Sequence, residues 1–188
     1  LNAGGRLSVL HAPASAYYAA KTFVMPEPRA ELSFIPNASH RFSASYTQAA
    51  QSIHMLTTSS VGIPSDMWMP ANALLKPSVM RQLALGYEYN FPDKEYTLSL
   101  EAYMRRTSHV VDYRKNADIF QNDRIEDEVE TGSARGCGLE FYLSKNKGAV
   151  TGWISYTLSR AQNKVATFED NEYPSLNYQR SEEHTSEL

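Results

Sequence analysis

Apolar and polar residues alternate along several stretches of this chain, and this period of two limits its fold more than any other feature. In residues 138–160, a run with Leu139 and Phe141 on one face is followed by "KNKG" and by a second run with Ile154 and Tyr156 on one face. Alternation of this kind is typical of β-strands, and four turn-forming residues between two such runs indicate a tight hairpin. The central question is therefore what the apolar faces of these strands contact.

The same alternation recurs along the chain, whereas no segment has a helical period. Similar runs occupy residues 29–34, 42–47, 82–91 and 96–103, and a further one, "GRLSVLH", lies near the start. Together with the two runs above, they predict an all-β fold of about seven long antiparallel strands.

The connections between these runs alternate strictly between short and long. The short ones are "PNASH" (36–40), "PDKE" (92–95) and "KNKG" (145–148), and the long ones are residues 12–28, 52–78, 106–132 and from 161 onward. An antiparallel meander with short turns at one end and long loops at the other is typical of outer-membrane β-barrels. Soluble sandwiches also alternate, but their strands average about 5–6 residues, and their loop lengths rarely segregate by end.

The composition of the two faces agrees with a membrane barrel. The polar faces hold Glu31, Glu88, Glu101 and Glu140, as a hydrated lumen would allow, and many of the aromatic residues, 11% of the chain, lie near strand ends. We therefore expect the strands to form the wall of a transmembrane β-barrel. Its outer face should expose to lipid the residues Leu83, Leu85, Tyr87, Leu98, Leu100, Leu139, Phe141, Ile154 and Tyr156.

An ordered set of segments also resembles a known family. The segments are "FVMPEPRAELSF", "FSASYTQAAQSIHML", "GIPSDMWMPAN", "LKPSVMRQLALGYEYNF", "YTLSLEAYMRRTSHVVDYRKNAD" and "GLEFYLSKNKGAVTGWISYTLSR". In that order they resemble the barrel of TonB-dependent outer-membrane receptors, in the branch that carries an N-terminal carboxypeptidase-regulatory-like domain. The resemblance covers nearly all of residues 5–179.

The resemblance implies a barrel of about 22 strands closed by an internal plug. The chain would then be an open, curved section of this large transmembrane β-barrel. Residues 1–179 would form about a third of it, from its C-terminal half, without the plug, the TonB box or the last strands. Such proteins lie in the outer membrane of Gram-negative bacteria and import siderophores, vitamins, glycans or peptides. The TonB–ExbB–ExbD complex would supply the energy through the N-terminal part, and outer-membrane lipid would surround the barrel.

Two other classes of protein remain open. One is an outer-membrane barrel without a plug, such as a porin-like channel or an adhesin, and the other is a soluble all-β module that binds carbohydrate. The final stretch "RSEEHTSEL" (180–188) continues no earlier pattern and matches one reading frame of a sequencing adapter, so we expect a non-native tail there.

The sequence shows no catalytic or metal-binding motif, so we expect neither an enzyme nor a cofactor. His109 and Asp112 would point to opposite faces of a strand, and Cys137 is the single cysteine. A formal net charge of −3 gives no electrostatic reason to expect nucleic acid as a partner. The acidic segment "NDRIEDEVE" (122–130) lacks the glycine of a calcium-binding turn and is expected to be a solvated loop.

The segment "TTSSVGIPSDMWMPAN" (57–72) is the strongest candidate for ligand contact. It places Met67, Trp68 and Met69 in a long loop on the side where a ligand would arrive. An apolar and aromatic cluster on an exposed loop is typical of a binding surface. The same cluster could instead anchor the loop by packing.

Overall fold

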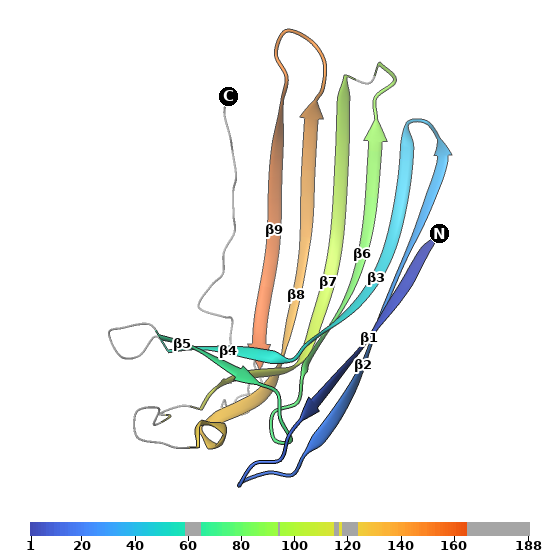
Figure 1. Cartoon of the computed structure of the whole chain (residues 1–188). Helices are drawn as coiled ribbons and strands as arrows, with labels where there is room; N and C mark the ends of the chain where they lie inside the picture. The colour runs from blue at the N-terminus through green and yellow to red at the C-terminus, as the bar shows by residue number, and fades with distance from the viewer. Residues whose placement is uncertain (59–64, 94, 115–116, 118–123, 165–188) are drawn as a thin grey trace.

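The computed structural model describes residues 1–58, 65–93, 95–114, 117 and 124–164, and within them the chain is all-β. Seven strands form one antiparallel sheet in the order β1-β2-β3-β6-β7-β8-β9, and β4 pairs with β5 in a separate hairpin. Figure 1 shows a tall, curved sheet that does not close into a barrel, with the hairpin lying across its lower end. The predicted fold class is confirmed. The elements are β1 (Asn2–Ala12), β2 (Lys21–Asn37), β3 (His40–Gln51), β4 (Ile53–Thr58), β5 (Ser65–Pro70), β6 (Ser78–Asn90), β7 (Tyr96–Tyr113), the 3-10 turn η1 (Ile125–Asp127), β8 (Val129–Lys145) and β9 (Gly152–Lys164).

The connections of the sheet segregate by length. The short ones join β2 to β3, β6 to β7 and β8 to β9 at one end, called here the turn end, and the longer ones lie at the opposite loop end. In the β2–β3 turn, Asn37 Oδ1 accepts hydrogen bonds from the backbone N–H groups of Ser39 and His40, each at 3.0 Å. An asparagine in this role stabilises a tight turn without help from other residues. No helix in the described residues is long and apolar enough to cross a membrane.

The strands extend further toward the loop end than the sequence predicts. β2 begins at Lys21, so the connection expected at residues 12–28 shortens to 13–20. This part of β2 contains Pro26 and Pro28 and pairs only with β1, whereas pairing with β3 begins at Arg29. A strand with one free edge tolerates proline, since no ladder hydrogen bond is needed on that side.

β7 and β8 also continue into the segment expected to be a loop at residues 106–132, which leaves only residues 114–128 between them. Their register shifts between Ser108 and Val110, and His109 in this bulge has a positive φ of 58°. The hydroxyl of Ser78 donates a hydrogen bond to the carbonyl of His109 at 2.7 Å. This contact holds the bulge, an unfavourable conformation for a residue with a side chain.

The cross-strand register places all nine residues expected on the outer face on one face of the sheet, called here the apolar face. Leu83, Leu85, Leu139, Ile154 and Tyr156 are between 44% and 65% exposed, and the other four are half-buried. The half-buried ones lie between large cross-strand neighbours in adjacent strands, which cover their flanks.

The opposite face, called here the polar face, carries Glu31, Glu88, Glu101 and Glu140. Beyond the pairing of neighbouring strands, the main contact between elements is that of β4 with β7 at the loop end. Most of the sheet is therefore a single layer in the described part of the chain. In a two-sheet sandwich the apolar face would be the centre of a core, and here it is not.

Candidate functional site

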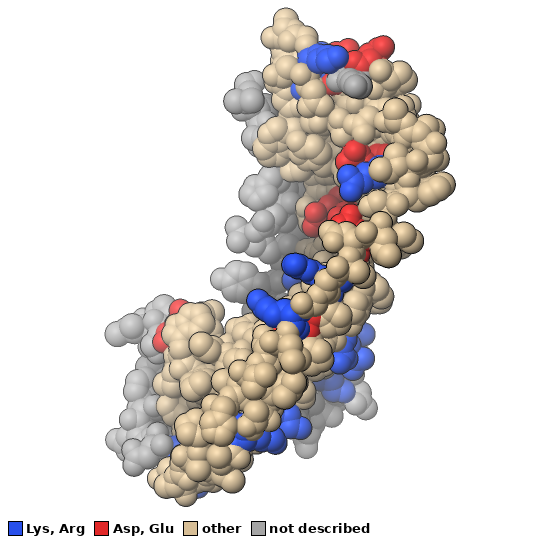
Figure 2. All heavy atoms as spheres, turned by 45° about the vertical axis from the view of Figure 1, so that its right-hand side comes forward, with Lys and Arg blue, Asp and Glu red and all other residues tan. Residues whose placement is uncertain are grey.

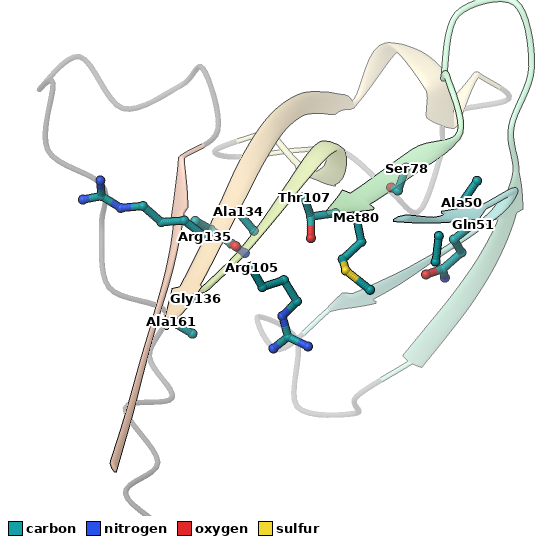
Figure 3. Close-up of a pocket in the computed structure, with 12 residues that line it drawn as sticks. Ala50, Gln51, Ser78, Met80, Arg105, Thr107, Ala134, Arg135, Gly136 and Ala161 are labelled. Atoms are coloured by element: carbon teal, nitrogen blue, oxygen red, sulfur yellow. The ribbon is translucent and has the colours of Figure 1, made fainter. Parts of the chain in front are cut away.

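A hollow of about 460 Å³ lies on the polar face near the loop end. Small side chains of β3, β8 and β9 create it, because neighbouring strands place alanine or glycine where a larger residue would fill the space. Figure 3 shows this region. The lining residues are Ala49, Ala50, Gln51, Ser78, Met80, Arg105, Thr107, Ala134, Arg135, Gly136, Ala161 and Asn163.

Arg105 gives the hollow its charge. Its side chain points into the open space, whereas that of Arg135, whose backbone lines the same hollow, points away to the other side of the sheet (Figure 3). Among the described residues, Arg105 has no hydrogen-bond or ion-pair partner. A guanidinium with open donors, surrounded by hydroxyl and amide groups, suits a carboxylate, sulfate or phosphate.

Two other arginines of the polar face are held by carboxylates. Arg6 forms a two-pronged contact with Glu27, at 3.2 and 2.5 Å, and Arg41 lies 3.5 Å from Glu31. These pairs stabilise neighbouring strands and leave little charge for a ligand. Arg105 is therefore the better candidate to meet an anionic group.

The hairpin of β4 and β5 lies beside this hollow and corrects the expected loop at residues 57–72. Met67, Trp68 and Met69 lie in β5, which is paired with β4, rather than in an irregular loop. Met69 is buried and Met67 is partly buried, whereas Trp68 is 64% exposed. The structure thus separates the three: two pack inward, and only Trp68 is open to contact. Residues 59–64 of the segment lie outside the described residues.

The buried face of the hairpin forms the apolar core of the loop end. Leu56, only 1% exposed, packs with Leu75 and Met69 of the hairpin segment and with Val111 and Val129 of the sheet. The core fixes the hairpin on the ends of β7 and β8, so exposed Trp68 is held at the loop end of the sheet. Hydrophobic periodicity in β4 and β5 is too short to predict this arrangement.

Comparison with models of known protein families, and with curated proteins, gives no match.

The other candidate residues do not form a site. The Nδ1 atom of His109 lies 3.2 Å from the carbonyl oxygen of Pro77, whereas Asp112 accepts a hydrogen bond from the N–H of Tyr113. In the acidic segment, Arg124 and Asp127 form an ion pair at 3.1 Å. No group of three His, Cys, Asp or Glu residues in the described part of the chain could hold a metal ion. The thiol of Cys137 is exposed.

His54 is a buried titratable group beneath the hairpin. It is 5% exposed, its Nε2 atom has no partner among the described residues, and its Nδ1 atom lies 3.5 Å from Ser78 Oγ. Burial lowers the pKa of this imidazole; a hydrogen bond with the Lys76 backbone raises it and nearby His109 lowers it further. The folded hairpin therefore holds His54 neutral.

We expect acid to loosen the hairpin. The pKa of His54 is lower in the folded state, so the unfolded state binds the proton first as the pH falls. The folded hairpin is therefore at its most stable above about pH 6.5, the ordinary pKa of histidine, and becomes less stable below that pH. Hydrogen–deuterium exchange at pH 7.5 and 5.5, corrected for intrinsic rates, should show faster opening of β4 and β5 at the lower pH. His11→Gln, on exposed β1, should keep this difference, and His54→Gln should remove it. Equal opening at both pH values in the unmodified protein would contradict the expectation.

Proposed function

We propose that the chain is a section of a TonB-dependent outer-membrane transporter. The observation that supports it best is the single-layer sheet whose two long faces differ in chemistry, one apolar and exposed, the other polar with charges of both signs. A water-soluble domain would bury such an apolar face. A barrel wall leaves it uncovered, because lipid takes the place of a core.

The height of the apolar face fits an outer membrane. Along β6 it extends from Arg81 to Tyr89, eight residue steps that span about 26 Å along the strand and about 20 Å vertically at a tilt of about 40°. The apolar band of such barrels is about 25 Å tall, and the outer membrane is thinner than average. The turn end of the band carries touching rings, with Phe42 and Tyr87 centroids 5.0 Å apart and Tyr89 and Phe91 centroids 4.7 Å apart. Aromatic girdles mark the membrane interface in barrels.

In this proposal the polar face lines the aqueous lumen and the hairpin lies at the outer mouth. A ligand that arrives from outside meets exposed Trp68 and then the hollow with Arg105. Energy for import comes from TonB–ExbB–ExbD through the plug-bearing N-terminal part. The chain performs no chemistry, and the ligand is a siderophore, vitamin, glycan or peptide.

Edge geometry also supports a larger barrel. β1 and β9 each pair on one side only within the described residues, so the sheet offers two free edges. Seven strands of this length and gentle curvature cover only part of a wide barrel. Further strands of the same protein would complete both edges.

The test compares a plugged transporter with an open channel. The full-length protein is purified from outer membranes, reconstituted in planar bilayers and also incubated with the periplasmic domain of TonB. A plugged transporter should show little conductance and should bind TonB. Steady conductance without TonB binding would indicate a porin-like channel, and a protein that remains soluble without detergent would refute any barrel.

A further inference from the structure

Three arginines form a row on the apolar face, at the point where the apolar band ends toward the loop end. Gln48 lies opposite Arg81, Arg81 opposite Arg106, and Arg106 opposite Arg135, so that adjacent strands bring three cations side by side. Gln162, opposite Arg135, completes the row, and Arg160 lies one position further along the same face of β9. All four arginines are exposed.

Arg81 and Arg106 have no acidic partner among the described residues. The side chain of Arg81 donates to the neutral Gln48 Oε1 at 2.9 Å, and that of Arg135 donates to Gln162 Oε1 at 2.8 Å. Arg106, between them, has no hydrogen-bond or ion-pair partner among the described residues. Directly opposed positions of antiparallel strands lie about 5 Å apart, and like charges there are destabilising.

Acidic residues are absent from this face. In the described strands, from the turn end to the arginine row, every Glu projects from the polar face, as Glu31, Glu88, Glu101 and Glu140 do. Figure 2 shows one side of the molecule, on which most basic side chains lie in the lower half, toward the loop end, and most acidic ones lie in the upper half. In the described strands the apolar face also carries Lys145 at the turn end, where it pairs with Glu95 at 3.1 Å, so the positive charge of this face gathers mainly toward the loop end.

An apolar hollow of about 550 Å³ lies beside the arginine row. Leu83 and Met104, the neighbours of Arg81 and Arg106 on the same face, line it together with Leu32 and Leu85. Ala44 and Ala102 form its floor because they are smaller than their neighbours. The apolar hollow therefore ends beside Arg81 and Arg106.

We propose that the arginine row binds the phosphate-bearing headgroup of an anionic membrane lipid whose acyl chain lies in the adjacent hollow. This inference rests on the proposed barrel, which puts the row at the headgroup layer. Guanidinium groups bind phosphate through paired hydrogen bonds, and a phosphate between adjacent arginines would offset their repulsion. An apolar hollow beside the cations selects a lipid over a free anion.

The test uses the full-length protein in nanodiscs of phosphatidylcholine with or without phosphatidylglycerol. The double variant Arg81→Gln/Arg106→Gln is compared with Arg29→Gln/Arg41→Gln, which removes two charges from the polar face instead. Native mass spectrometry counts phosphatidylglycerol retained by each protein. The first variant should bind it about 30-fold more weakly, because each arginine at a headgroup layer contributes about a fivefold factor. The second variant should bind it as the unmodified protein does.

Other outcomes separate this inference from the proposed barrel. If neither the unmodified protein nor the variants enter phosphatidylcholine bilayers, the barrel proposal fails. If all of them insert but retain phosphatidylglycerol equally, only the lipid site is refuted. Inorganic phosphate is added in a further arm, and full displacement of the lipid at millimolar phosphate would show an anion site instead of a lipid site.

Discussion

A Leu139→Arg substitution is expected to prevent most of the full-length protein from reaching a folded state in the outer membrane. Leu139 lies opposite Ala102 and Leu158 in the middle of the apolar face and is 51% exposed. An arginine facing lipid near the midplane costs about 2–4 kcal/mol, a large part of the stability of a typical protein. The yield of the heat-modifiable, folded form in outer membranes measures the loss.

The adjacent Glu140→Arg substitution is the matched control. Glu140 lies on the polar face opposite Glu101, so an arginine there remains hydrated and gains an acidic neighbour. Strand, depth and introduced residue are the same in both variants, and only the facing differs. We expect an unchanged yield for Glu140→Arg. Equal losses in the two variants, or a larger loss for Glu140→Arg, would mean that the faces are reversed or that no membrane is involved.

A Leu56→Ala substitution is expected to release the β4–β5 hairpin while leaving the sheet intact. Leu56 is the most buried large side chain among the described residues, and its truncation leaves a cavity that costs about 2–5 kcal/mol. Backbone amides of β4 and β5 should exchange at least about 30-fold faster, whereas those of β6 should not change.

Met55→Ala provides the control at the neighbouring position. Met55 is 49% exposed and projects from the opposite side of the hairpin, opposite Trp68, so its truncation opens no cavity. We expect exchange in β4 and β5 to stay within about threefold of the unmodified protein. If both variants loosen the hairpin equally, the core at the loop end is not what holds it.

The sequence predicts most of the sheet because each strand shows its own alternation of apolar and polar residues. Alternation in residues 82–91 or 138–160 sets both the strand and the face of every side chain, since the period of two is enforced by geometry. Turn chemistry such as that of Asn37 fixes where the strands end. The short connections at the turn end were therefore predictable.

The loop end was harder because its structure depends on contacts between distant segments. β4 and β5 are short, and their pairing is stabilised by burial of Leu56 against Val111 and Val129, which lie more than 50 residues away in sequence. Pro26 and Pro28 lie in a part of β2 that pairs on one side only, where proline is tolerated, and that one-sided pairing is visible only in the structure.

Neither the hollow with Arg105 nor the arginine row could be located without the register. A signal for the arginine row was nevertheless present: Arg81 is in phase with Leu83 and Leu85, and Arg106 with Met104. Arginines that share a face with apolar residues, at the same end of consecutive strands, indicate where the surroundings of that face change from apolar to polar. To place these arginines side by side, the register between the strands is also needed, and the sequence alone does not supply it.

The order of the strands has a consequence for how such a wall can assemble. Every pairing in the sheet joins strands that follow one another in the chain, except that of β3 with β6, between which only the β4–β5 hairpin intervenes. Each new strand can therefore add to the edge left by its predecessor, without waiting for a remote partner. Nearest-neighbour growth of this kind keeps loop-closure entropy small at every step. Within the described residues β9 offers an edge of the same kind, on which a further strand could pair.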